Sequence, residues 1–220
     1  MKRLNFSISA KAETYILEKM VRWLPKWVTP DLLTALAFLA AVVGFFCYLK
    51  SYNNFYFLWG VNICLIVHWF ADSLDGKLAR FRKDERPNYG FYVDHILDSV
   101  SAVLFLGGLN SSSLTITAAW DWVIVLILLC MTHVFLKSKA TGTFEFSIGI
   151  VGPTEARILL FALNCFIFFA GNPHVNIFIP MTLVDLIGWI TSFGLAIILT
   201  QQIVATAFKL NKQDRLKKVR

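Results

Sequence analysis

Six stretches of this sequence, each 15 to 27 residues long, contain no Asp, Glu, Lys or Arg. They are residues 32–49, 51–71, 99–120, 122–136, 158–184 and 186–208. A helix needs about 20 apolar residues to cross the hydrocarbon core of a bilayer. A water-soluble domain interrupts its apolar stretches more often, and only 16% of the residues here are charged. The sequence therefore predicts an all-α integral membrane protein.

The apolar stretches predict six transmembrane helices that together leave no room for a separate soluble domain. We expect the spans at residues 32–50, 55–80, 91–109, 114–137, 154–171 and 180–208. Residues 1–220 are thus interpreted as a single membrane domain, with a six-helix core at 32–208 and a basic cytosolic tail at 209–220. The first residues, MKRLNFSISAK, lack the apolar region of a cleaved signal peptide.

The 21 Lys and Arg residues indicate the orientation of the spans. From the N-terminus to the C-terminus, the segments outside and between the spans carry 6, 1, 5, 0, 3, 0 and 6 of them. Cytoplasmic segments carry the excess of positive charge, so both termini and the 2–3 and 4–5 connections are expected on the cytoplasmic side. The net charge of +7 then reflects topology and attraction to anionic membrane lipids, and no nucleic-acid partner is expected.

Residues 10–28 precede the first span and are too polar to cross a membrane. Their apolar residues share one helical face: Ile16, Met20, Trp23, Leu24 and Trp27. This pattern, with Lys11, Arg22 and Lys26 on another face, favours an amphipathic interfacial helix lying in the headgroup plane. A solvated helix packed on the cytosolic connections is the alternative.

The most informative stretch runs from Asp72 to Asp98. It reads D-x-x-D-G-x-x-A-R, then nine residues, then G-x-x-x-D-x-x-x-D. On a helix, Asp72, Asp75, Gly76 and Ala79 form one stripe, because they stand at positions i, i+3, i+4 and i+7. Asp94 and Asp98 stack on one face of the next helix. The short connection, with Pro87 and Asn88, makes an antiparallel hairpin in which four carboxylates can converge.

Four carboxylates at a membrane edge repel one another unless cations balance them. Oxygen ligands favour hard ions, so Mg²⁺ or Mn²⁺ is expected here over zinc. Four negative charges match two divalent ions, which suit phosphoryl chemistry. Gly76 and Ala79 leave room beside the stripe, and Arg80 offers a bidentate phosphate donor. Single carboxylates near span ends are usually solvated caps, which is the interpretation for Asp84, Asp121 and Asp185.

The motif resembles the signature of the CDP-alcohol phosphatidyltransferases at every fixed position, and the six spans fit that family too. The resemblance implies that Asp72, Asp75 and Asp94 hold one metal ion. It implies that Asp72, Asp94 and Asp98 hold a second, with Asp98 also the base for the acceptor hydroxyl.

The resemblance also implies a donor site and an assembly. Gly76, Ala79 and Arg80 match positions that contact the CDP group. The family's Pro-Asn-x-x-Thr motif reads Pro30-Asp31-Leu32-Leu33-Thr34 here, so Asp31 and Thr34 are further donor-binding candidates, together with Arg86. A homodimer is implied as well.

Three features bear on the substrates. The block Asp94-His95-Ile96-Leu97-Asp98-Ser99 is similar to the D-H-x-x-D-S of choline and ethanolamine phosphotransferases. His95 either assists the base, contacts an amino-alcohol, or is an ordinary polar neighbour. Glu155 and Arg157 either cap and anchor the fifth span or line the site, and lining is slightly favoured. Lys137 and Lys139 either meet an acceptor or snorkel to the interface.

The sequence thus predicts a phospholipid-biosynthetic transferase. It would move a substituted phosphate from a CDP-linked donor, either CDP-diacylglycerol or a CDP-amino-alcohol, to an alcohol, with release of CMP. One alternative is an aspartate-rich Mg-dependent membrane prenyltransferase, which lacks the Gly76-x-x-Ala79-Arg80 insertion. The other is a non-catalytic membrane protein that binds divalent ions.

Overall fold

The structure is a computed structural model that describes residues 3–4, 17, 19–142, 144–145, 152–176 and 179–218. Six long helices dominate it, and each is long and apolar enough to cross a membrane. They are α2 (Pro30–Lys50), α3 (Phe57–Arg82), α4 (Pro87–Asn110), α5 (Ala119–Thr141), α6 (Pro153–Ala170) and α7 (Leu183–Lys218). The predicted all-α membrane fold with six spans is therefore confirmed.

Local sequence signals set the ends of the helices that form the site. Thr29 caps α2 by accepting a hydrogen bond from the Leu32 backbone N–H at 3.2 Å. Pro87 and Pro153 occupy the first turns of α4 and α6, where a missing N–H costs nothing. Lys83 ends α3 in the left-handed conformation, with φ 57°, and the Asp84 N–H returns to the Ala79 carbonyl at 3.0 Å. This abrupt stop allows the short connection between α3 and α4.

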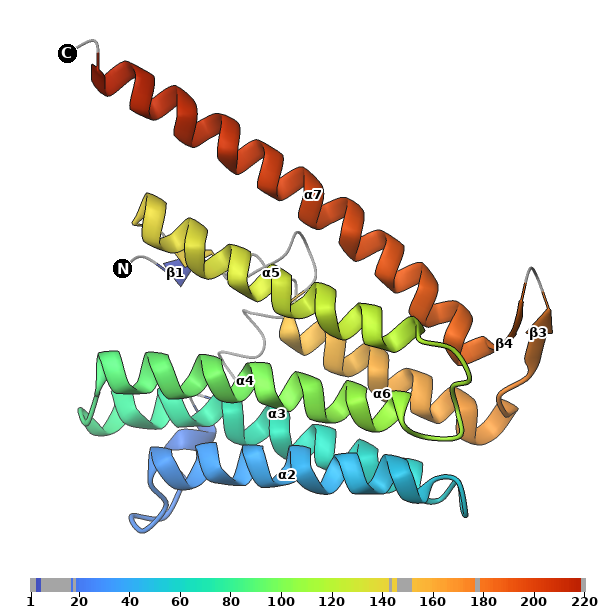
Figure 1. Cartoon of the computed structure of the whole chain (residues 1–220). Coiled ribbons are helices and arrows are strands. Elements are labelled where there is room, and N and C mark those ends of the chain that lie inside the picture. Colours follow the sequence, from blue (N-terminus) through green and yellow to red (C-terminus); the bar gives the residue numbers. More distant parts are fainter. Residues whose placement is uncertain are drawn as a thin grey trace.

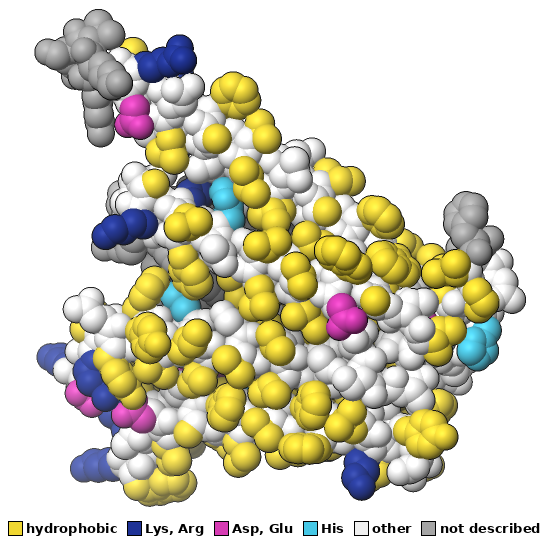
Figure 2. Space-filling view, in the orientation of Figure 1, with side chains coloured by type: hydrophobic (Ala, Val, Ile, Leu, Met, Phe, Trp, Pro, Cys, Tyr) yellow, Lys and Arg dark blue, Asp and Glu magenta, His cyan; other side chains and the backbone are white. Residues whose placement is uncertain are grey.

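Helix α2 packs on both α3 and α4, α5 packs on α4, α6 on α3, and α7 on α5 (Figure 1). We call the end where α3 stops and α4 starts the aspartate end. Strand β1 (Arg3–Leu4) and the last turns of α7 also lie toward this end in Figure 1. In Figure 2, Lys and Arg side chains gather there, while hydrophobic side chains cover the middle of the visible face.

Two apolar clusters hold the bundle together. The larger one lies between α2, α3, α4, α5 and α6 and includes the fully buried side chains of Tyr48, Leu58 and Leu109. The smaller one joins Ala71, Leu74 and Leu78 of α3 to the start of α2 and to Leu17, Val21 and Val28. This cluster fixes one face of α3, and Asp72 and Asp75 lie on the neighbouring face, where they line a pocket together with residues of α2 and α4.

The segment before α2 is described only in part. Leu17 and residues 19–21 are helical, and the rest of the expected helix before residue 19 lies outside the described residues. Leu17 and Val21 are buried, while Trp23 is 87% exposed and Trp27 72% exposed. Arg82 donates to the carbonyls of Pro25, Lys26 and Val28, which fastens this segment to the end of α3. The interfacial position of the segment stays a prediction.

Some expected boundaries are wrong. The last span does not begin at residue 180, because β3 (His174–Asn176) and β4 (Pro180–Thr182) form an antiparallel hairpin before α7. The expected tail at 209–220 is helical through Lys218, so α7 has 36 residues and a length of about 54 Å. A short parallel pairing of β1 with β2 (Phe144–Glu145) joins the N-terminal segment to the α5–α6 connection.

Asp185 is not the solvated cap that its place near a span end suggested. Its side chain is fully buried and accepts hydrogen bonds from Thr182, Ile116 and Thr117. These bonds tie the α4–α5 connection to the first turn of α7. Asp185 therefore has a structural role at the end of the bundle opposite the aspartates.

Candidate active site

The four aspartates of the motif face one another in two tiers. Asp75 and Asp94 each lie seven residues from the aspartate end of α3 and α4, while Asp72 lies ten and Asp98 eleven residues from it. At about 1.5 Å per residue, the second tier is about 5 Å deeper than the first. The antiparallel hairpin thus brings together all four carboxylates that the sequence predicted to converge.

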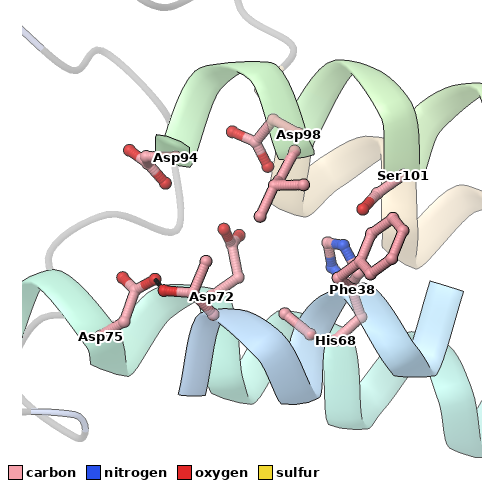
Figure 3. A pocket seen from close by; sticks show the side chains of 10 residues that line it. Phe38, His68, Asp72, Asp75, Asp94, Asp98 and Ser101 are labelled. Atoms are coloured by element: carbon pink, nitrogen blue, oxygen red, sulfur yellow. Dashed lines mark hydrogen bonds between the residues drawn. The ribbon is translucent and has the colours of Figure 1, made fainter. Parts of the chain in front are cut away.

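One pocket is lined by all four aspartates (Figure 3). It encloses about 230 Å³ of space, part of it open to solvent. Helices α2, α3 and α4 supply its other lining residues, which are Thr34, Ala37, Phe38, His68, Leu97 and Ser101. Figure 3 shows His68 and Ser101 beyond the Asp72–Asp98 tier, next to Phe38. The pocket therefore has an acidic end and a deeper, uncharged end.

Thr34, a predicted donor-binding residue, contacts one of the four aspartates. Its Oγ1 lies 2.7 Å from Asp75 Oδ2 and 3.1 Å from the Pro30 carbonyl oxygen. The single hydroxyl proton favours the shorter contact, because a hydrogen bond to an ionised acceptor is the stronger one. Thr34 thus orients Asp75 from α2, a role that the sequence did not indicate.

Arg157 of α6 reaches the second tier. Its Nη2 lies 2.8 Å from Asp72 Oδ2 and 3.5 Å from Asp98 Oδ1. All three side chains are mostly buried, with 13–20% exposure. The guanidinium bridges a carboxylate of α3 and one of α4 and compensates part of the negative charge of the cluster. Of the two interpretations for Arg157, lining the site is the one that the geometry supports.

Glu155 does not accompany Arg157 to the aspartates. It accepts a hydrogen bond from the Gly152 backbone N–H at 3.0 Å and completes a capping box at the start of α6. The slight preference for Glu155 as a lining residue is not supported, because its carboxylate serves the end of its own helix.

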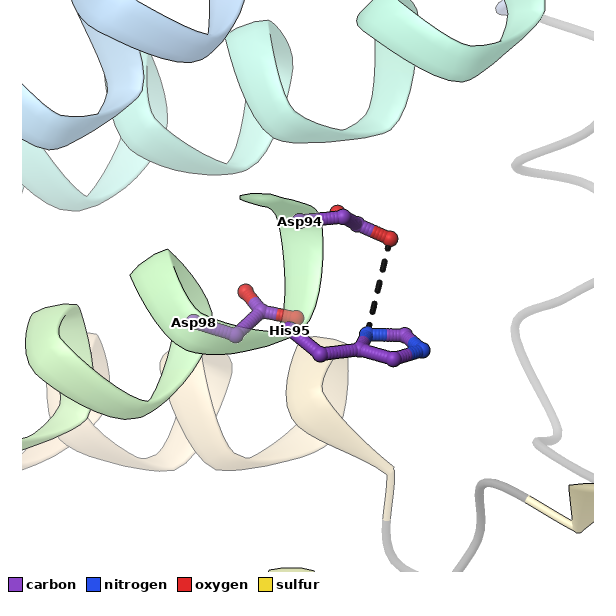
Figure 4. Close-up of side chains that lie close together, drawn as sticks. All are labelled: Asp94, His95 and Asp98. Carbon is purple, nitrogen blue, oxygen red and sulfur yellow. Dashed lines mark ion pairs between the residues drawn. The ribbon is translucent and has the colours of Figure 1, made fainter. Parts of the chain in front are cut away.

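His95 lies beside the aspartates but does not line the pocket. Its side chain is buried, with the ring centroid 4.3 Å from that of Phe91 and 5.5 Å from that of Phe135. Its Nδ1 lies 3.6 Å from Asp94 Oδ2 (Figure 4). Asp94, His95 and Asp98 each offer one ligand atom within 4.8 Å of the others. The ring packing favours a supporting role for His95, with the four aspartates as the ligand set.

The expected donor-binding residues of α3 continue the stripe toward the aspartate end. Gly76 and Ala79 follow Asp75 outward, and the guanidinium of Arg80 folds back near Gly76. A Cβ added at Gly76 would lie 3.6 Å from Arg80 Nη1, which is ordinary van der Waals contact. None of these three residues lines the pocket, so they lie between it and the aspartate end of α3.

Asp31 and Arg86 pair with each other. The Arg86 guanidinium donates to Asp31 Oδ1 and lies 4.5 Å from the Tyr89 ring centroid. Both members of the pair are about half exposed, with values of 45% and 54%. The pair links the start of α2 to the α3–α4 connection at the aspartate end.

The two polar pocket residues His68 and Ser101 were missed by the sequence analysis, although a signal existed for each. His68 precedes Asp72 by four residues and so shares its helical stripe, and Ser101 follows Asp98 by three. An ionisable residue within a membrane span is a functional candidate in its own right. Their place became evident only once α3 and α4 were set side by side.

Comparison with known proteins agrees with this geometry. The family model for CDP-alcohol phosphatidyltransferase matches residues 27–200, which include all four aspartates and Arg157. A curated relative from Dictyostelium discoideum, an uncharacterized CDP-alcohol phosphatidyltransferase class-I family protein, is 26% identical over 162 residues. Those residues make up 69% of this chain but 41% of the relative, so the chain spans less than half of the relative's length. The chain belongs to the CDP-alcohol phosphatidyltransferase family.

The family uses divalent metal ions, and the pocket residues fit that requirement. The ligand set around the pocket consists of four carboxylates from two helices, and oxygen ligands are those that Mg²⁺ and Mn²⁺ prefer. Phosphoryl-transfer sites commonly hold ions between carboxylates in this way. The donor set is therefore suited to hard divalent cations.

Proposed function

We propose that this protein transfers a substituted phosphate group from a CDP-linked donor to the hydroxyl of an alcohol and releases CMP. The observation that carries the proposal is the convergence of Asp72, Asp75, Asp94 and Asp98 in one pocket within a membrane bundle. The four carboxylates come from two helices and are bridged in part by Arg157, which distinguishes them from a set of acidic residues scattered on an exposed surface.

In the proposed reaction, the aspartates hold Mg²⁺ or Mn²⁺, with two ions matching their four charges. When bound, the ions neutralise the donor diphosphate and polarise the phosphorus that is attacked. Gly76, Ala79 and Arg80 would bind the donor at the aspartate end, where small side chains leave the backbone of α3 accessible. Arg86 would also bind the donor there if its guanidinium released Asp31 and bonded to a phosphate oxygen instead.

Asp98 is proposed as the base. An alcohol hydroxyl is a poor nucleophile at neutral pH, so a base must take its proton as the new P–O bond forms. Asp98 lies in the deeper tier, next to the uncharged end of the pocket, whereas Asp75 and Asp94 lie in the outer tier. As the hydroxyl oxygen attacks phosphorus, the bond to CMP breaks and the proton passes to Asp98.

The proposed orientation places both termini and the pocket mouth on the cytoplasmic side, as the distribution of Lys and Arg indicates. There the pocket would meet CDP-linked donors. The homodimer stays a proposal that rests on the family alone.

Purified protein incubated with CDP-diacylglycerol or a CDP-amino-alcohol and a panel of alcohols tests the function through release of CMP. The expected result is release that stops with a chelator and returns with Mg²⁺ or Mn²⁺. Consumption of a prenyl diphosphate instead would support the prenyltransferase alternative. Ion binding without CMP release from any pair of substrates would support the non-catalytic one.

A further inference from the structure

The deeper end of the pocket holds two polar side chains that the four-aspartate mechanism does not use. His68 and Ser101 each lie fourteen residues from the aspartate end of α3 and α4, so they form a third tier below Asp72 and Asp98. Both side chains are 3% exposed and both line the pocket. His68 projects from α3 and Ser101 from α4 into the pocket that the aspartates also line (Figure 3).

Neither side chain finds a hydrogen-bond partner among the described residues. His68 Nδ1 is buried without one, and its ring meets only the edge of Phe105, at a centroid distance of 5.5 Å. The Ser101 hydroxyl makes no hydrogen bond within the described part of the chain, whereas Ser99 and Thr132 donate to the carbonyl four residues earlier. Buried polar atoms without partners are rare, and His68 Nδ1 is one that calls for an explanation.

Trp69 Nε1, Asn110 Oδ1 and His133 Nε2 are also buried without a partner in the described part of the chain, but of these residues and His68 only His68 lines the pocket. Elsewhere in the bundle, buried polar side chains satisfy one another. Tyr48 Oη donates to Asn164 Oδ1 at 2.9 Å, and Asn164 Nδ2 donates to Asn62 Oδ1 at 2.9 Å. This chain of hydrogen bonds joins α2, α6 and α3, so these polar groups are paired within the protein. The third tier differs, because its polar atoms point into a pocket.

We propose that His68 and Ser101 bind the hydroxyl group of the acceptor and that the acceptor is a neutral lipid alcohol. The hydroxyl oxygen of the acceptor can accept a hydrogen bond from the Nδ1–H of neutral His68 or from the Ser101 hydroxyl. Its own proton then stays available to Asp98, the residue proposed to take it, which lies on the next tier toward the aspartate end. This inference rests on the proposed function and deepens it.

The walls of the third tier determine the class of alcohol. Phe38 lies beside His68 and Ser101 (Figure 3), the apolar Ala37 and Leu97 also line the pocket, and no Lys, Arg, Asp or Glu lines it deeper than Asp72 and Asp98. A phosphorylated or zwitterionic acceptor would leave its charge unpaired there, which is unfavourable inside a bundle. The apolar walls suit the carbon atoms next to the hydroxyl of a lipid that enters from the membrane.

The test uses full-length protein with diacylglycerol in mixed micelles as the lipid alcohol, and inositol, serine and glycerol 3-phosphate as soluble ones. His68→Phe and Ser101→Ala are each expected to lower kcat/KM for diacylglycerol about tenfold, since each removes one hydrogen bond to the acceptor. The donor dissociation constant, measured by calorimetry, should stay within about twofold of wild type. His133→Phe, in α5 and outside the pocket lining, is the matched control and should change neither quantity.

Two conservative variants keep the test independent of folding defects. The side-chain amide of Asn overlies the Nδ1 position of His, and that of Gln overlies Nε2. His68→Asn should therefore retain most of kcat/KM, and His68→Gln should resemble His68→Phe. A structural role for the ring would not separate these two variants.

An unchanged kcat/KM in both His68→Phe and Ser101→Ala would overturn the assignment, as would an equal loss of donor affinity. Transfer by wild type to soluble alcohols only would overturn the lipid alcohol as acceptor. These results differ from failure of the proposed function, in which the wild-type protein would release no CMP with any substrate pair.

Discussion

Asp98 and Asp75 occupy different tiers of one carboxylate cluster, and their neighbours differ. Asp75 belongs to the outer tier and accepts a hydrogen bond from Thr34, whereas Asp98 contacts Arg157 and adjoins the uncharged end of the pocket. Asp98→Asn is expected to lower kcat by about 10² to 10⁴-fold, the usual contribution of a general base, with much of the donor binding retained. Asp75→Asn should weaken metal and donor binding together.

Calorimetric donor affinity beside CMP release separates the two outcomes for these variants. Turnover of Asp98→Asn near the wild-type rate would show that another group is the base, and His95 would be the next residue to test.

Arg157 bridges Asp72 and Asp98, two residues expected to hold the second metal ion. Repulsion between a guanidinium and a divalent ion about 5 Å away is worth about 1.7 kcal/mol even at the dielectric constant of water. Arg157→Gln should therefore raise Mn²⁺ affinity in the absence of donor by about tenfold. Arg157→Lys keeps the charge and should raise it less.

Electron paramagnetic resonance of free Mn²⁺ during a titration measures this change. Lys139→Gln, which removes a cation from the same end of the bundle, is the control. Weaker Mn²⁺ binding by Arg157→Gln would contradict the expectation and assign Arg157 to holding the carboxylates in place.

At the scale of the helices, α2 and α4 approach each other closely near the end of the bundle opposite the aspartates. A Cβ at Gly108 would lie 3.0 Å from Phe45 Cα and 3.2 Å from the Phe45 carbonyl oxygen, both of which are backbone atoms that cannot move aside alone. A Cβ at the adjacent Gly107 would meet no atom within 4 Å. The contact between α2 and α4 thus depends on one glycine of the pair.

Gly108→Ala is expected to destabilise the protein by about 1–3 kcal/mol, as overpacking of a close contact does. Gly107→Ala should be neutral or stabilise it by up to about 1 kcal/mol, because alanine favours a helix. Thermal unfolding in detergent compares the two directly. Equal midpoints for both variants would show that α2 and α4 do not approach as closely as described.

For the whole molecule, the decisive property is its orientation in the membrane. Asp84 lies in the α3–α4 connection and Ser111 in the connection after α4, at opposite ends of the bundle. Asp84→Cys should react with a membrane-impermeant thiol reagent only from the cytosol, and Ser111→Cys only from the other side. Labelling of both from the same side would refute the six-span topology. The four native cysteines are free and lie within spans, so a variant without them is the suitable background.

The sequence alone predicted the class of fold and the acidic half of the site. Charge-free stretches of about 20 residues are long enough to cross a bilayer. They cross it as helices, because lipid offers no hydrogen-bond partner to backbone N–H and C=O groups and a helix pairs these groups internally. The spacing Asp72, Asp75 and Asp94, Asp98 puts each pair on one helical face whatever the rest of the chain does. The short connection then keeps the ends of α3 and α4 that carry these pairs near each other. These features depend on local geometry, which the sequence carries directly.

Only the tertiary structure decided which distant residues complete the site. Arg157 lies 85 positions from Asp72 and Thr34 lies 41 from Asp75, so no periodicity could join them. The packing of α6 on α3 and of α2 on both α3 and α4 brings them together. The same packing buries Asp185 and puts His68, rather than His95, in the lining of the pocket. Contacts of this kind depend on how helices approach one another in space, and that depends on side-chain volumes along the whole length of each interface.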